Sequence, residues 1–69
     1  MIDTSGLIGI IYSRGLSQRK VAKSLGITEK TFYEKMKKGV FNSTEIEAMI
    51  GILGIENPME IFFANDVAR

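Results

Sequence analysis

The sequence predicts an all-α domain built from five short helices, and three observations lead to this prediction. Apolar residues recur at spacings of three and four along most of the chain, which is the period of a helix. A glycine follows each of the first four periodic segments, where a left-handed residue commonly ends a helix. A serine, threonine, asparagine or aspartate stands before each segment, and these side chains cap helix N-termini.

Length and composition limit the other possibilities. The chain has 69 residues, 45% of them hydrophobic, so one domain spanning residues 1–69 is expected. It contains no cysteine and no histidine, which removes disulfides, thiolate metal sites and the usual neutral-pH acid–base catalyst. We therefore expect no metal, no cofactor and no catalytic site, and an enzyme is the least favoured class.

No secretory or membrane signal is visible. The N-terminus lacks a basic region leading into an apolar run. The most hydrophobic window, residues 46–55, contains Glu47 and is much shorter than the roughly 20 residues of a membrane span. We expect a cytoplasmic protein, in a bacterial host cell on the resemblance described below, with no membrane partner.

The first predicted helix covers residues 4–14. Asp3 or Thr4 is its expected N-cap, and Gly15 is placed to end it in the left-handed conformation. Two glycines in its first turns, Gly6 and Gly9, weaken the helical propensity there. Its expected apolar side consists of Leu7, Ile10 and Ile11.

The next two predicted helices are joined by a glycine turn. Ser17 caps a helix over residues 18–25, Gly26 ends it, and Thr28 caps a helix from residue 29 to about residue 37. The expected inward-facing residues are Val21, Ala22, Leu25, Ile27, Phe32 and Met36. The third helix then presents an outer face made of Glu29, Lys30, Tyr33, Glu34 and Lys37.

The C-terminal third predicts two more helices. Gly39 ends the third helix, and Val40 and Phe41 are expected to anchor the following loop. The fourth helix covers about residues 45–53, with Thr44 and Glu47 matching a capping box and Asn42 or Ser43 as alternative caps. Its expected inner side consists of Ile46, Met49, Ile50 and Leu53.

Asn57 and Pro58 predict the start of the fifth helix, which should reach about residue 64. Phe62 and Phe63 cannot both face one core on a helix this short. One should pack inward, and the other is either a dimer contact or a residue at the rim of the core. Residues 65–69 are expected to fray.

The overall charge of +1 conceals a strong segregation. From Arg14 to Lys38 there are eight basic and two acidic residues, a net charge of +6, whereas the remaining residues carry a net charge of −5. A basic segment backed by an acidic remainder orients the molecule's field toward an anionic partner. The alternative is an ordinary solvated lysine-rich surface, but here the basic segment coincides with the predicted helix pair.

The spacing from Gln18 to Lys37 resembles the helix–turn–helix of the phage Cro/CI repressor-like family. The residues that carry the resemblance are Gln18, Ala22, Gly26, Ile27 and Phe32. The resemblance covers nearly the whole chain and implies a five-helix, lambda-repressor-like DNA-binding domain with the helix–turn–helix at helices two and three. Lys35 departs from the family, where an apolar residue often stands, although its stem could still pack.

The resemblance implies a transcriptional regulator of a phage or prophage lysis–lysogeny switch that binds double-stranded operator DNA, with the possibility of a weak homodimer. Helix three would enter the major groove, where Lys30 could read guanine and a glutamate could accept from cytosine. Arg19, Lys37 and Lys38 would contact phosphates. The full set of implied contact residues is Gln18, Arg19, Thr28, Glu29, Lys30, Thr31, Tyr33, Glu34, Lys37 and Lys38.

Two glutamates and a tyrosine on helix three leave a second function open. A mixed-charge helix bearing a tyrosine also suits a protein interface. Some small phage proteins with this fold are antirepressors, which bind a partner repressor's DNA-binding domain. The resemblance therefore also implies an antirepressor that would cover a cognate phage repressor with its helix 2–3 surface and block operator binding.

Overall fold

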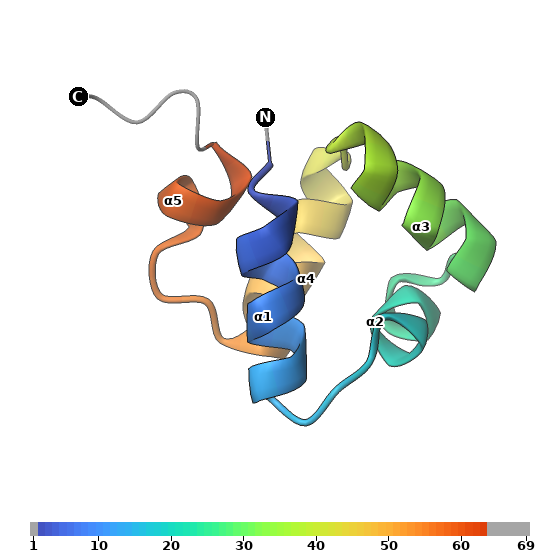
Figure 1. Ribbon diagram of the computed structural model, residues 1–69, viewed down its shortest axis with the longest axis horizontal. Coiled ribbons are helices and arrows are strands. Elements are labelled where there is room, and N and C mark those ends of the chain that lie inside the picture. Colours follow the sequence, from blue (N-terminus) through green and yellow to red (C-terminus); the bar gives the residue numbers. More distant parts are fainter. Residues whose placement is uncertain (1, 64–69) are drawn as a thin grey trace.

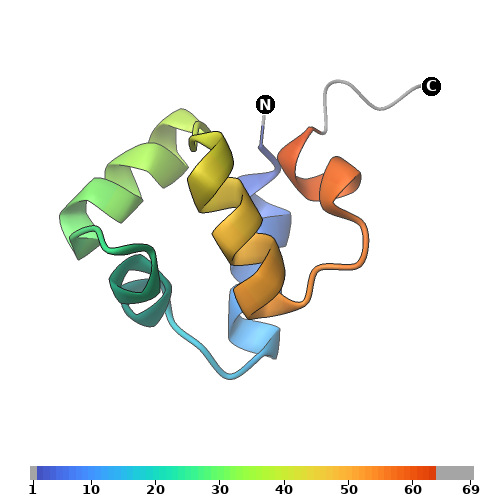
Figure 2. The ribbon, with the colours of Figure 1, turned by 180° about the vertical axis from the view of Figure 1, so that it is seen from behind.

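The computed structural model describes residues 2–63, and this part of the chain is all-helical. Its elements are α1 (Thr4–Ser13), α2 (Gln18–Leu25), α3 (Glu29–Lys38), α4 (Ser43–Leu53) and α5 (Pro58–Phe62). Helices α1 and α4 lie in the middle, with α2 and α3 on one side and α5 on the other (Figures 1 and 2). None of the described helices is both long and apolar enough to cross a membrane.

One hydrophobic core joins all five helices. Leu7 and Ile11 from α1, Phe32 from α3 and Met49 from α4 are completely inaccessible to solvent. The core is completed by Ile2, Val21, Ala22, Met36, Phe41, Leu53, Ile55 and Phe62. Each helix therefore contributes its apolar side, as the helical spacing predicted. Five residues that were expected to face inward are only partly buried: Ile10, Leu25, Ile27, Ile46 and Ile50.

The turn between α2 and α3 has the geometry that the sequence predicted. The Ser17 side chain accepts a hydrogen bond from the Lys20 amide and caps α2, and the Thr28 side chain accepts from the Thr31 amide and caps α3. Gly26 adopts φ +76°, a left-handed conformation that glycine tolerates and a branched side chain resists. The Ile27 amide donates to the Ala22 carbonyl at 3.1 Å, which closes the end of α2. The two helices are thus joined by a turn of only three residues.

The start of α4 differs from the predicted capping box. Asn42, not Thr44, is the N-cap: its side chain accepts from the Glu45 amide at 2.8 Å, and the Glu45 carboxylate accepts from the Asn42 amide at 2.9 Å. Because the cap lies two residues earlier, α4 begins at Ser43. Asn42 was named as an alternative cap, and local sequence could not decide between two overlapping boxes.

Three smaller predictions in the C-terminal third were wrong or only half right. Phe41 is buried in the core, but Val40 is 64% exposed and anchors nothing. Asn57 precedes α5 without a side-chain capping bond, and α5 ends at Phe62, earlier than expected. The prediction that only one of the two adjacent phenylalanines packs inward is confirmed, because Phe62 is buried and Phe63 is 37% exposed. The prediction for residues 65–69 lies outside the described residues.

The two glycines of α1 have different roles. A Cβ atom built on Gly6 would lie 2.6 Å from the Asp3 carboxylate and 3.1 Å from Ile61 Cδ1, whereas one on Gly9 meets nothing within 4 Å. Asp3 caps α1 by accepting from the Gly6 amide at 3.0 Å. Asp3 also donates its own amide to the Ile61 carbonyl at 2.7 Å. Gly6 therefore permits the close approach of α1, its cap and α5.

We expect Gly9→Ala to raise the free energy of unfolding by about 0.5–1 kcal/mol, because alanine restricts the unfolded chain and favours the helix. Gly6→Ala should gain nothing and should destabilise the protein, because the new methyl group displaces the Asp3 cap. Urea unfolding of both variants measures the difference. An equal stabilisation by both substitutions would contradict the close approach at Gly6.

Candidate functional site

The outer side of α3 carries a stripe of charged residues. Lys30, Glu34 and Lys37 are all exposed and follow one another at spacings of four and three residues, so they lie along one side of the helix. Phe32 and Met36 occupy the opposite side and are buried. The core thus fixes the rotation of α3 about its axis and presents two lysines and one glutamate outward.

Glu29 and Tyr33 form a hydrogen-bonded pair beside this stripe. The Tyr33 hydroxyl donates to Glu29 Oε2 at 2.8 Å across one turn of α3. This hydrogen bond raises the pKa of the Tyr33 hydroxyl above its ordinary value, and the neighbouring Tyr12 adds a smaller effect in the same direction. The pair holds the Glu29 carboxylate along the helix surface, and Tyr33 remains 46% exposed.

The remaining predicted contact residues lie at the two helix starts and at the end of α3. Arg19, Lys38 and Thr28 are exposed, whereas Gln18 and Thr31 are half-buried. Thr28 and Thr31 are engaged with each other, because the Thr28 hydroxyl donates to the Thr31 hydroxyl at 2.9 Å. Helices α2 and α3 pack directly against each other, so the predicted set occupies one continuous helix pair (Figure 1).

Lys35 does not belong to the exposed basic surface. Its ammonium group lies 2.5 Å from Glu45 Oε2, and this ion pair joins α3 to the first turn of α4. Glu45 is only 7% exposed, so burial on its own would raise the pKa of its carboxyl group. The hydrogen bonds from Lys35 and from the Asn42 amide outweigh burial and lower the pKa below its ordinary value. The sequence predicted that the Lys35 stem could pack but missed this partner.

Arg14 also makes hydrogen bonds that stabilise the fold. Its Nε donates to the Leu53 carbonyl at 2.7 Å and its Nη2 to the Gly54 carbonyl at 3.4 Å. These carbonyls lie at the C-terminal end of α4, where a cation is favourable because the helix dipole is negative. The two residues lie 39 and 40 positions from Arg14, so no local pattern could have indicated this role.

The exposed charge on the helix pair is therefore smaller than the sequence suggested. With Arg14 and Lys35 engaged elsewhere, six basic residues remain on α2 and α3 against two glutamates, a net charge of +4. All six are exposed, and none forms an ion pair within residues 2–63. They are Arg19, Lys20, Lys23, Lys30, Lys37 and Lys38.

Comparison of the chain with family models, with curated proteins and with solved structures finds no match.

Proposed function

We propose that the protein is a phage or prophage transcriptional regulator that binds operator DNA through α2 and α3. The observation that carries this proposal is the Lys30–Glu34–Lys37 stripe, exposed on a helix whose opposite side is fixed in the core. A rigid helix with lysines directed outward can enter the major groove and approach base edges. The protein acts by binding and has no catalytic role in this proposal.

Base recognition and phosphate contact fall to different residues. Lys30 is in the first turn of α3 and can donate to guanine O6 and N7, while Glu34 can accept from cytosine N4. Arg19 on α2, with Lys37 and Lys38 at the end of α3, neutralises phosphates and releases counterions. The net charge of +4 on the helix pair makes the approach to DNA favourable despite the two glutamates.

Lys30→Ala should relax specificity at one base pair and cost about 1–3 kcal/mol of binding free energy on the cognate site, because it removes one base-edge contact. Lys38→Ala should instead weaken binding to all sequences and reduce the slope of log affinity against log salt by roughly 1. Fluorescence-anisotropy titrations with cognate and scrambled duplexes measure both effects. The matched control is Lys23→Ala, an exposed lysine of α2 outside the proposed contact set. Binding without salt dependence would contradict the DNA proposal.

A second candidate function is favoured by the exposure of the two tyrosines. Tyr12 on α1 is 58% exposed and Tyr33 on α3 is 46% exposed. Tyrosines are frequent anchors of protein interfaces. In this candidate function, the helix 2–3 surface covers the DNA-binding helices of a cognate repressor and the protein acts as an antirepressor.

One gel-shift experiment separates the two functions. It uses the protein alone, the repressor alone and both together on one operator. A shift by the protein alone supports operator binding, whereas loss of the repressor's shift when the protein is added supports the antirepressor. In the second case, Glu29→Lys with Glu34→Lys should abolish the protein's complex with the repressor in the absence of DNA. A fully intact complex after both reversals would rule out the proposed interface.

A further inference from the structure

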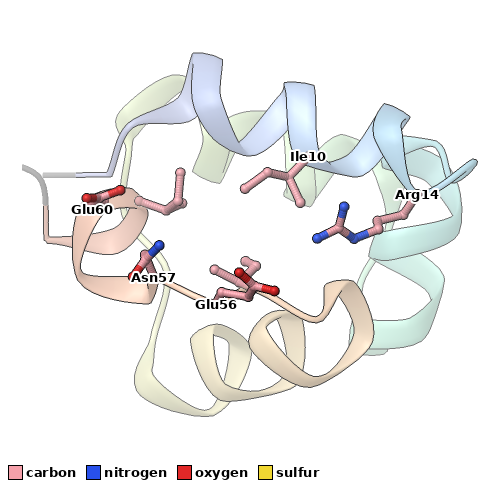
Figure 3. Close-up of a pocket in the computed structure, with 7 residues that line it drawn as sticks. Ile10, Arg14, Glu56, Asn57 and Glu60 are labelled. Atoms are coloured by element: carbon pink, nitrogen blue, oxygen red, sulfur yellow. The ribbon is translucent and has the colours of Figure 1, made fainter.

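A groove opens between α1 and α5, on the side of the molecule away from α3. Figure 3 shows its walls, which come from the last half of α1, the connection after α4 and the short α5. Its volume is about 270 Å³. Binding sites for whole drug-sized molecules occupy about 300–1,000 Å³, so this groove is suited to one or two side chains of a larger partner.

The apolar part of the groove is aliphatic. Ile10 from α1, Ile55 after α4 and Ile61 from α5 line it. Ile55 is 8% exposed and belongs to the core, while Ile10 and Ile61 are half-buried and pack against the core. This apolar surface gains free energy when a branched aliphatic side chain displaces water from it.

The polar part of the groove is acidic and is not arranged to hold an anion. Glu56 and Glu60 both line it, both are exposed, and neither forms an ion pair within residues 2–63. Arg14 also lines the groove, but its guanidinium donates to the Leu53 and Gly54 carbonyls and to Ser13 Oγ. These acceptors are neutral and leave the charge of Arg14 in place, so Glu56, Glu60 and Arg14 together give the groove a net charge of −1. The two carboxylates are the groups that remain able to pair with a cation of a partner.

Asn57 adds a group able to pair with a peptide backbone. Its side chain lines the groove beside Glu56 and Glu60 (Figure 3). Although Asn57 stands before α5, its side chain makes no capping hydrogen bond. Its amide is available to donate to a carbonyl and accept from an N–H, which are the two groups that a peptide bond offers.

We propose that this groove binds a peptide segment of a partner protein in which a branched aliphatic residue stands beside lysine or arginine. The aliphatic side chain occupies the Ile10–Ile55–Ile61 surface, the cation lies between Glu56 and Glu60, and the backbone bonds to Asn57. Charge complementarity selects this occupant, because nucleic acid is repelled by the two carboxylates and a purely apolar ligand leaves them unused.

The proposal does not depend on operator binding. Helix α5 and the α2–α3 pair lie on opposite sides of α1 and α4 in both views (Figures 1 and 2). A basic peptide in the groove and an anionic partner on α2 and α3 would therefore not compete for the same surface. The protein could hold both partners together.

The test is an NMR titration of the whole protein, labelled at its isoleucine methyl groups. The probe is the capped peptide Ac-Gly-Ile-Arg-Ile-Lys-Gly-NH2, and the control peptide has glutamate in place of both basic residues. We expect saturable shifts of the Ile10, Ile55 and Ile61 methyls with the basic peptide only, with Ile27 of the α2–α3 turn unchanged. Glu56→Gln with Glu60→Gln should weaken binding roughly fivefold, while Glu47→Gln, an exposed glutamate outside the groove, should not.

Three results would overturn the proposal. The first is the absence of methyl shifts with the basic peptide at concentrations up to about 5 mM, which would place the dissociation constant in the millimolar range or above. The second is an equal response to the acidic control peptide, which would show that the carboxylates do not select the partner. The third is a shift of the groove methyls on concentrating the protein alone, which would assign the groove to a second copy of this chain.

Discussion

Phe32→Ala should destabilise the protein by about 3–5 kcal/mol, because it removes a large side chain from a site with no solvent access. The centroids of the Phe32 and Phe41 rings are 5.5 Å apart and the ring planes are inclined by 51°. The substitution therefore also removes an aromatic pair. Phe32 is the residue that fixes α3 against the rest of the core. A domain of 69 residues has a total stability of only about 3–10 kcal/mol, so a large part of it should be lost.

Urea unfolding followed by circular dichroism measures the loss. Tyr33→Ala is the matched control, since it truncates the adjacent aromatic residue on the exposed side of the same helix. This control should change stability by less than about 1 kcal/mol. A Phe32→Ala variant as stable as the Tyr33→Ala variant would mean that α3 does not pack against the core through Phe32. The outward orientation of the Lys30–Glu34–Lys37 stripe would then be contradicted as well.

Glu45→Gln should destabilise the protein by about 2 kcal/mol at neutral pH. The substitution keeps the size of the side chain but removes the charge that pairs with Lys35 and weakens the bond to the Asn42 amide. The Lys35 side chain is 30% exposed, so water offsets part of the loss and the effect stays below that of a fully buried pair. Glu47→Gln, on the exposed side of α4, should stay within about 0.5 kcal/mol of the wild type.

The same pair predicts an acid-dependent loss of stability. Lys35 and Asn42 hold the pKa of Glu45 below its ordinary value against the opposing effect of burial. The contribution of Glu45 is therefore complete above the pKa of an unfolded glutamate, about 4.3, and declines as the pH falls through the lower folded-state pKa. The free energies of unfolding of the wild type and Glu45→Gln should therefore differ at pH 7 and approach each other at pH 3. A difference that is equal at both pH values would contradict the ionised pair.

Much of the helical structure could be predicted because its determinants are local. A cap such as Ser17 or Thr28 bonds to an amide three residues away, and the left-handed glycines at 26, 39 and 54 end their own helices. The exposed outer face of α3 also followed from spacing, because Phe32 and Met36 mark the side that must be buried. Where two local signals overlapped, at Asn42 and Thr44, the sequence did not discriminate between them.

The candidate site could be predicted only in outline. The residues of α2 and α3 that face solvent were expected, and nearly all of them are exposed. Their electrostatic balance was not, because Arg14 and Lys35 were counted as free charges. The groove on the α5 side was not expected, since its walls come from three separate segments of the chain.

The sequence by itself determined the helices, the caps at Ser17 and Thr28 and the side of each helix that faces the core, because these depend on residues within one or two turns of each other. Only the tertiary structure decided which charges are free. The Lys35–Glu45 pair spans two helices, and the bonds from Arg14 cross 39 and 40 positions. Such contacts arise when the packed core brings distant segments together, so spacing along the chain carries no signal for them.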